Sequence, residues 1–365
     1  MKSASLACRV AALAGLLAFA EASHSHHHSH DHRTQHLRTP TEEGDLAVQK
    51  RGGQCQFPTD AGLVAVTPDS DNAGWAMSPD QKCTPGSWCP YACPAGQVSM
   101  QWNPKATSYT YPLSMDGGLY CDEDGNMQKP FPDKDYCVDG TGTVSAVNKA
   151  GQALSFCQTV LPGNEAMLIP TLVEDTATLA VPGPSFWLST AAHFYINPPG
   201  TGTEGCIWGT NANPIGNWAY FVAGANTDST GNTFVKIGYN PVVQEASTPF
   251  RDTPATFGVE ITCDDDAGCN GLPCKIDPSV NALNEVTSNE SSDGAGGAAY
   301  CVVTVPKGKS ANLYSIVNFF SHNHVSQPKL SQLNKHLKHL KRIKLDSKLD
   351  HIHSDQLFFL FHVIL

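Results

Sequence analysis

The sequence predicts a mostly β, disulfide-rich fold, in which one domain forms an antiparallel β-sandwich. Three observations predict this class. Short runs of β-branched and aromatic residues are bounded by Gly, Pro, Asn and Asp. Twelve cysteines remain after an N-terminal leader is set aside. No sustained helical periodicity and no internal repeat occur before residue 325. About 270 residues is large for one domain but acceptable for an all-β chain.

Residues 1–20 have the pattern of a secretory signal peptide. Lys2 and Arg9 precede a short apolar run that ends in Ala18-Phe19-Ala20, a small-x-small cleavage pattern. The alternative, a membrane anchor, would need about 20 apolar residues. We therefore expect export to an oxidising compartment.

Residues 21–51 carry seven histidines and end in the dibasic pair Lys50-Arg51. A His-rich tract can bind metal loosely, but nothing here fixes a coordination geometry. This segment is interpreted as a propeptide, and the folded domain is expected to occupy residues 52–320.

An even number of cysteines in an oxidising compartment predicts a disulfide framework. Paired C-x2-C knuckles, typical of zinc sites, and a redox C-x-x-C are both absent. Neither a metal nor a cofactor is expected. Two local knots are predicted, at 83–93 and 263–274, and the pairing is left open. The predicted disulfide cysteines are Cys55, Cys83, Cys89, Cys93, Cys121, Cys137, Cys157, Cys206, Cys263, Cys269, Cys274 and Cys301.

Five segments are the clearest strand candidates. Residues 226–232 (NTDSTGN) predict a hairpin between two of them. Phe257, Val259 and Ile261 alternate with less apolar neighbours, as in a half-buried strand. The candidate segments are 184–197, 217–225, 232–240, 256–263 and 298–306.

Charge narrows the range of partners. Residues 52–321 hold 26 acidic and 10 basic side chains, a net charge of −16. Such a surface repels nucleic acid and anionic membranes, so neither is expected as a partner. It suits a neutral ligand, although solubility alone also explains it.

The distribution of histidines limits which residues could act in catalysis. His193 is the only histidine between residues 52 and 321, and it lies in an apolar, strand-like run. A structural role therefore fits His193 better than that of a general base. No G-x-S-x-G elbow, P-loop or G-x-G-x-x-G before a helix occurs. Hydrolytic chemistry would rest on carboxylates.

Aromatic residues gather in turn-rich segments. All six tryptophans fall between positions 75 and 218. Aromatic faces on loops can stack on the apolar faces of sugar rings, although core packing should take about half of them. The predicted substrate-binding residues are Trp88, Tyr91, Trp102, Tyr120, Trp208 and Trp218.

At these residues the chain resembles the fungal SUN family of secreted cell-wall β-glucosidase and glucanase-like proteins. The resemblance rests on CQFPTDAG, GSWCPYACPAGQVSMQWNP, GGLYC, FWLSTAAHFYINPPG, GCIWG and GNWAYFVAGAN. It covers residues 55–319 and includes the Cys-x5-Cys-x3-Cys element at 83–93. The following gap, to Cys121, is slightly longer than in the best-known members.

The resemblance implies a secreted wall protein with β-1,3-glucan as its partner. It implies glycosidase activity in wall remodelling and septation, without supplying a catalytic pair. A non-catalytic wall protein that binds β-glucan is the alternative, and a thaumatin-like sandwich with an acidic cleft is compatible with both.

Glycoside hydrolysis usually needs two carboxylates, one as acid and one as nucleophile or base. Asp116 and Glu204 lie among glycines and aromatic residues near cysteines. They are the predicted catalytic pair, with Asp122 and Glu123 in reserve. The run Asp264-Asp265-Asp266 is interpreted as a charged turn, with calcium as its alternative.

Residues 321–365 turn basic and His-rich, and the family resemblance stops there. A basic amphipathic helix at a membrane surface is one interpretation. A disordered or mis-predicted extension, such as translated intron, agrees better with the composition.

The only N-x-S/T sequon within residues 52–320 is Asn289-Glu290-Ser291, in a Ser- and Gly-rich segment. We predict one N-glycan on Asn289 after secretion from yeast. Mass spectrometry before and after endoglycosidase treatment checks this, and an unchanged mass would contradict it.

Overall fold

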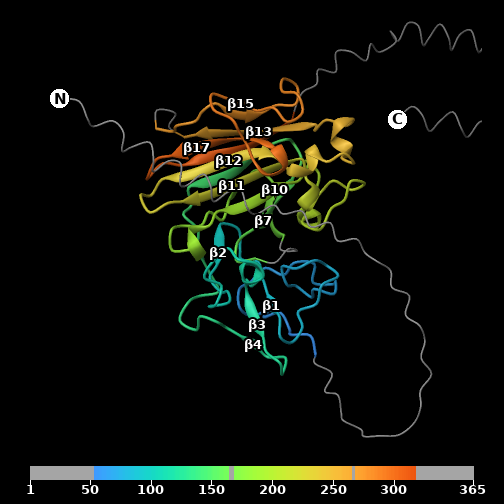
Figure 1. Ribbon diagram of the computed structural model, residues 1–365, viewed down its shortest axis with the longest axis vertical. Coiled ribbons are helices and arrows are strands. Elements are labelled where there is room, and N and C mark those ends of the chain that lie inside the picture. Colours follow the sequence, from blue (N-terminus) through green and yellow to red (C-terminus); the bar gives the residue numbers. More distant parts are fainter. Residues whose placement is uncertain (1–52, 164–167, 265–267, 318–365) are drawn as a thin grey trace, which may run out of the picture. The chain divides into compact units, whose positions relative to one another are not determined.

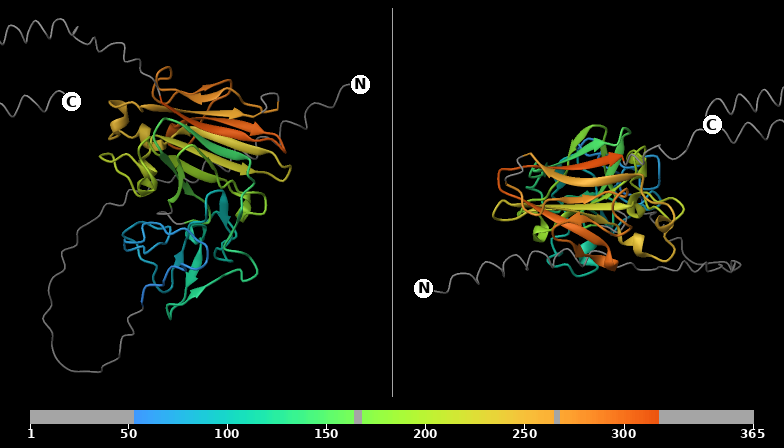
Figure 2. Two further views of the ribbon diagram at one scale, coloured as in Figure 1. Left: turned by 180° about the vertical axis from the view of Figure 1, so that it is seen from behind. Right: turned by 90° about the horizontal axis from the view of Figure 1, so that it is seen from above.

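The computed structural model describes residues 53–163, 168–264 and 268–317. Two large β-sheets lie face to face in this part of the chain, and the described residues contain no α-helix (Figures 1 and 2). The predicted signal peptide, the whole of the predicted propeptide and the basic tail lie outside the described residues. No helix among the described residues combines the length and the apolar character that crossing a bilayer requires.

The first sheet has seven strands, and each hydrogen-bonded pair in it is antiparallel. Strands β11 (Phe221–Thr227) and β12 (Thr233–Tyr239) form the predicted hairpin, closed by a turn over Asp228–Gly231. In spatial order the strands are β16 (Ser292–Asp293), β17 (Ala299–Val305), β12 (Thr233–Tyr239), β11 (Phe221–Thr227), β10 (Ala192–Ile196), β7 (Leu154–Thr159) and β8 (Ile169–Val173).

The second sheet has six strands, and one neighbouring pair, β18 (Ala311–Val317) and β6 (Val144–Lys149), is parallel. These are the first and last long strands of the sandwich, so no hairpin connects them and none forces them to be antiparallel. In spatial order the strands are β15 (Thr287–Ser288), β14 (Cys274–Ile276), β13 (Phe257–Cys263), β18 (Ala311–Val317), β6 (Val144–Lys149) and β9 (Thr176–Thr178).

Residues 53–140, here called the N-terminal lobe, contain only short strands. One small sheet consists of β1 (Trp88–Cys89), β3 (Leu119–Cys121) and β4 (Met127–Gln128). A second consists of β2 (Gln97–Ser99) and β5 (Cys137–Asp139).

The described helices are all single 3₁₀ turns. They are η2 (Leu113–Met115), η3 (Trp187–Ser189), η4 (Thr203–Gly205), η5 (Gly216–Trp218), η6 (Pro241–Gln244), η7 (Pro249–Arg251) and η8 (Ala295–Gly297).

The main core lies between the two large sheets. Period-2 alternation directs one face of each strand inward, as Val259 and Ile261 of β13 show. The ring centroids of Phe221, on β11, and Phe257, on β13, are 5.2 Å apart and join the two layers. The same apolar cluster continues into the N-terminal lobe through residues such as Trp102.

All twelve predicted cysteines are paired in six disulfides. Three hold the lobe together and three lie in the sandwich. The pairs are Cys55–Cys121, Cys83–Cys89, Cys93–Cys137, Cys157–Cys206, Cys263–Cys269 and Cys274–Cys301.

Each predicted local knot forms in part: Cys83–Cys89 and Cys263–Cys269 are local pairs, but the third cysteine of each knot bonds elsewhere. Cys93 bonds to Cys137, which brings β5 of the lobe against the 83–93 segment. Cys274 lies on β14 and bonds to Cys301 on β17, so this disulfide joins the two large sheets. Spacing along the chain favours near neighbours, whereas the pairs formed depend on which strands face each other.

The N-terminal lobe is attached to the sandwich by hydrogen bonds and ring contacts. The indole N–H of Trp187, in η3, donates to the carbonyl of Ala106 in the lobe. The ring of Trp102 packs against Phe186, with centroids 5.6 Å apart. The amide of Gly117 donates to the carbonyl of Gly163, at 3.0 Å.

Replacing both Cys274 and Cys301 by alanine should lower the free energy of unfolding by about 2–5 kcal/mol. The matched control is the double replacement of Cys263 and Cys269, which lie only 6 positions apart, whereas Cys274 and Cys301 are 27 apart. Loop-closure entropy alone makes the first loss larger by about 1 kcal/mol. Urea unfolding of the two variants measures the difference, and an equal or smaller loss for the inter-sheet pair would contradict this account.

Candidate functional site

The candidate site is a cleft of about 910 Å³ on the N-terminal lobe. Three aromatic side chains line it: Trp88 and Tyr111 from the lobe, and Trp208 from a loop of the sandwich. Asp80 and Asp116 are the acidic side chains that line it among the described residues. Aromatic rings and carboxylates therefore line the same concave site.

Two glycines determine the course of the backbone after Asp116. A Cβ atom on Gly117 would lie 2.1 Å from the carbonyl oxygen of Pro162. Gly118 has a φ of +92°, and a Cβ there would lie 2.0 Å from the carbonyl oxygen of Cys89. Only glycine allows so close an approach. The segment after Asp116 can therefore pack directly against β1 and the 162–163 segment.

Hydrogen bonds with Asn103 hold Asp116 in place. The side-chain amide of Asn103 donates to Oδ2 of Asp116 at 2.8 Å, and the backbone amide of Asn103 donates to the carbonyl of Asp116 at 2.9 Å. Asn103 is itself only 7% exposed, and its Oδ1 accepts from the amide of Lys105. The carboxylate of Asp116, which is partly buried, thus has a defined orientation in the cleft.

Trp88 forms one wall of the cleft. It lies on β1 directly opposite Tyr120 on β3, and the two ring centroids are 5.1 Å apart. The neighbouring Cys89 is fully buried and bonded to Cys83. Tyr120 is partly exposed and supports Trp88 from the adjacent strand.

Trp208 lines the cleft from the sandwich side and is 46% exposed. Its loop is bonded to β7 through Cys157–Cys206. The amide of Gly209 donates to Oδ1 of Asn217 at 2.8 Å, which closes the loop after the tryptophan. Because the disulfide already restricts this loop, little conformational entropy is lost when a ligand stacks on the exposed indole.

The structure places four predicted substrate-binding residues outside the cleft lining: Tyr120, which packs against Trp88, and Tyr91, Trp102 and Trp218. Tyr91 is 1% exposed, donates to the carbonyl of Tyr136, and burial raises the pKa of its hydroxyl above the usual range. Trp102 is 8% exposed and packs between Phe131 and Phe186. Trp218 is partly buried in η5 and does not line the cleft. Tyr91 and Trp102 are core residues, and neither can stack on a ligand.

Of the predicted acids, only Asp116 lines the cleft. Glu204 is exposed in η4, and its Oε1 accepts from the amide of Gly202 at 2.8 Å. Asp122 closes the β3–β4 turn: its Oδ1 accepts from the amides of Asp124 and Asn126. These hydrogen bonds, with that to Asn126 first, lower the pKa of Asp122.

Glu123 is exposed and lies beside the cleft. Its Oε1 is 3.1 Å from the point where a Cβ of Gly86 would stand, and Gly86 lines the cleft. Sequence reasoning missed Asp80 and Tyr111, which also line it. Their positions before Cys83 and before the η2 turn placed them on loops, but only the fold brings them beside Trp88.

A family profile described as "Beta-glucosidase (SUN family)" matches residues 50–303. A Saccharomyces cerevisiae protein of uncharacterized function is 58% identical over 269 residues, which is 72% of this chain and 76% of that protein. The "probable secreted beta-glucosidase adg3" of Schizosaccharomyces pombe is 54% identical over 263 residues, 71% of this chain but 23% of that protein. The "secreted beta-glucosidase SIM1" of Candida albicans is 31% identical over 269 residues, 69% of this chain and 64% of that protein.

The chain thus spans less than two thirds of the Schizosaccharomyces and Candida relatives. No solved structure matches the chain significantly.

Replacing Gly117 by alanine should lower the free energy of unfolding by about 1–3 kcal/mol, because the new methyl group clashes with the backbone of Pro162. The matched control is Gly183→Ala, where the nearest atom would be a methyl of Thr141 at an ordinary 3.5 Å. Its effect should stay within about 0.5 kcal/mol. Urea unfolding compares the two, and equal stabilities would show that Gly117 does not define the path of the Asp116 segment.

Proposed function

Since this chain belongs to the SUN family, we propose that it is a secreted cell-wall glycoside hydrolase that acts on β-glucan. One observation carries the proposal: Trp88, Trp208 and the oriented carboxylate of Asp116 line the same cleft. The names of the Schizosaccharomyces and Candida relatives, which call them secreted β-glucosidases, support it.

The cleft suits a neutral polysaccharide. Sugar rings present apolar C–H faces that stack on indole and phenol rings, and their hydroxyls bond to polar groups at the rim. Trp88 belongs to the lobe and Trp208 to a loop of the sandwich, and both line the cleft. A glucan chain that stacks on both would occupy the cleft that Asp116 also lines.

Cleavage of a glycosidic bond needs one carboxyl group that protonates the departing oxygen. A second carboxylate attacks the anomeric carbon or activates water. We propose Asp116 as one member of this pair, because Asn103 holds it at a fixed position. We propose Asp80 as the other member, because it is the second acid lining the cleft among the described residues. Glu204, the partner predicted from the sequence, is compared with Asp80 by mutation.

The finer proposal is that the substrate is β-1,3-glucan and that the role is wall remodelling at septation. It rests on the family resemblance of the cysteine and tryptophan motifs. Product analysis with β-1,3-linked laminari-oligosaccharides and β-1,4-linked cello-oligosaccharides tests the linkage. Equal cleavage of both, or cleavage of the β-1,4 series alone, would contradict it.

Asp116→Asn should reduce turnover of laminari-oligosaccharides by about a hundredfold or more, since the amide cannot supply a charge or a proton. Asp80→Asn should show a comparable loss, and Glu204→Gln should retain turnover. Initial rates at saturating substrate measure all three. A large loss in Glu204→Gln together with an active Asp80→Asn would return the pairing to Asp116 and Glu204.

Trp208→Ala should weaken oligosaccharide binding by about fivefold, the effect of losing roughly 1 kcal/mol of apolar contact. Tyr109→Ala is the matched control, because Tyr109 is 44% exposed, close to the 46% of Trp208, yet does not line the cleft. Calorimetric titration gives both affinities. Equal effects of the two replacements would remove Trp208 from the binding site.

A binding-only role gives a different pattern. Wild-type protein would then bind laminari-oligosaccharides without releasing products, and Trp208→Ala alone would weaken binding. That outcome would assign the cleft to a non-catalytic β-glucan-binding wall protein.

A further inference from the structure

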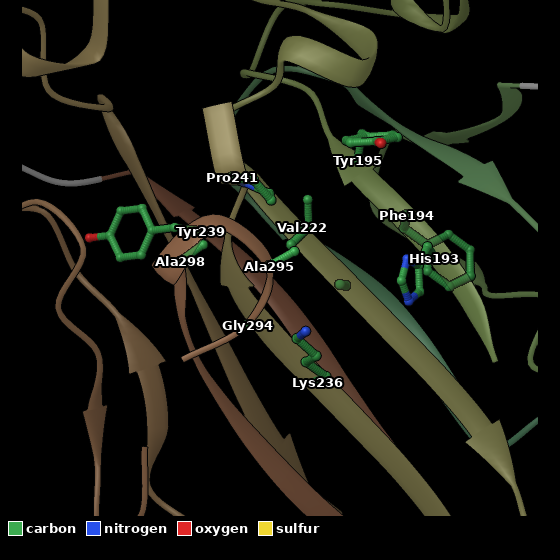
Figure 3. Close-up of a pocket in the computed structure, with 11 residues that line it drawn as sticks. His193, Phe194, Tyr195, Val222, Lys236, Tyr239, Pro241, Gly294, Ala295 and Ala298 are labelled. Carbon is green, nitrogen blue, oxygen red and sulfur yellow. The ribbon is translucent and has the colours of Figure 1, made fainter. Parts of the chain in front are cut away.

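A second, smaller cavity of about 50 Å³ lies on the seven-stranded sheet. His193 and Tyr195 of β10, Val222 of β11 and Lys236 of β12 line it, together with the loop around Ala295. Figure 3 shows His193 and Lys236 on different strands, with the Gly294–Ala295 loop beside the lysine. None of the residues proposed for glucan binding or cleavage lines this cavity.

A glycine on β11 separates two polar residues that line the cavity. Gly224 stands directly between His193 and Lys236 in the sheet register, since it pairs with both. A Cβ at Gly224 would lie 3.4 Å from the His193 ring, so the absent side chain leaves the space between the two polar residues open.

Lys236 brings a partly buried positive charge to the cavity. Among the described residues, no carboxylate lies within ion-pair distance of its amino group. By contrast Lys275, on the other large sheet, pairs with Asp277 at 3.1 Å. The amino group of Lys236 is 3.9 Å from the centroid of the Tyr300 ring, which only partly replaces the lost hydration.

At pH 7 the protonation states of Lys236 and His193 favour the binding of an anion in this cavity. Burial lowers the pKa of Lys236 to about 8, so the amine is still mostly protonated at pH 7. Burial, and then the charge of Lys236, lower the pKa of His193 to about 4. The imidazole is therefore neutral at pH 7 and carries one N–H donor. The Tyr239 hydroxyl is engaged elsewhere, since it donates to the carbonyl of Ala282.

We propose that this cavity binds the carboxylate or phosphate group of a small molecule, with Lys236 as its counter-ion and the His193 N–H as a second donor. An oxyanion would supply the negative charge that the described residues do not place beside Lys236. A charge-assisted hydrogen bond of this type is stronger than a neutral one.

The dimensions agree with a small group. A volume of about 50 Å³ holds roughly three or four water molecules, comparable with one carboxylate or phosphate and smaller than a sugar ring. Tyr195 and Pro241 also line the cavity and add apolar surface to it. The remainder of the ligand would therefore lie over these side chains, outside the cavity.

The test is a titration of the ¹⁵N-labelled secreted protein at constant ionic strength, followed by NMR. The probes are inorganic phosphate, glucuronate and glucose 6-phosphate, with glucose as the neutral control. We expect saturable shifts of the Gly224 and Ala295 amides with at least one anion below about 50 mM, and none with glucose. Comparing the shifts caused by phosphate with those caused by glucuronate shows whether the cavity binds a phosphate or a carboxylate group.

Lys236→Met should weaken this binding about tenfold or more, and Lys236→Arg should retain most of it. Lys149→Met, which removes an exposed lysine from the other large sheet, should leave it unchanged. The proposal fails if no anion gives saturable shifts at Gly224 and Ala295, or if Lys236→Met binds like wild type. If Lys236→Met does not fold, the wild-type shift map and Lys236→Arg decide. Asp116→Asn should bind the anions normally, so this result is independent of the glucan cleft.

Discussion

Disulfide bonds in the N-terminal lobe are the constraint on which the candidate site depends. The strands of this lobe are two or three residues long, too short to hold a sheet by hydrogen bonding alone. Three disulfides connect them, and the buried cystines form a small core with Trp75 and Leu119. Each such bond typically contributes about 2–4 kcal/mol by restricting the unfolded chain. Covalent links thus perform the task that a hydrophobic core performs in the sandwich.

Disulfide bonds of the lobe, together with one of the sandwich, set the geometry of the candidate cleft. Cys83–Cys89 fixes the strand of Trp88, and Cys157–Cys206 fixes the loop of Trp208, so each aromatic wall is adjacent to a cystine. Gly117 and Gly118 allow the segment after Asp116 to pack against the 162–163 segment and β1, and Asn103 orients the carboxylate. The cleft is therefore built from irregular backbone that covalent bonds and close packing keep in place.

The sandwich provides a rigid support and a chemically different surface. Its two sheets share a continuous apolar core, and Cys274–Cys301 joins them covalently. On the seven-stranded sheet Lys236 lines a small cavity, and among the described residues no carboxylate lies within ion-pair distance of its amino group. The protein therefore has two separate surfaces of different character. One is a cleft lined by aromatic and acidic side chains, and the other is a small cavity lined by Lys236.

Local sequence patterns predicted the elements that alternate clearly. Strand β13 and the β11–β12 hairpin follow from such patterns and are confirmed. Strand β7 was missed because five of its six residues are buried, which leaves no alternation to recognise. Trp88, Trp208 and Asp116 were identified from their Gly- and Cys-rich context. The burial of Tyr91 was not predictable, because its hydrogen-bond partner, Tyr136, is 45 residues away in the chain.

The most direct test of the central claim is an NMR titration of the tryptophan indole N–H groups with laminaritetraose. A glucan bound in the cleft should shift the signals of Trp88 and Trp208, which line it, and leave that of the fully buried Trp75 unchanged. Saturable shifts confined to Trp88 and Trp208 are the predicted result. Shifts at other tryptophans with Trp88 and Trp208 unaffected, or no saturable shift at all, would contradict the account.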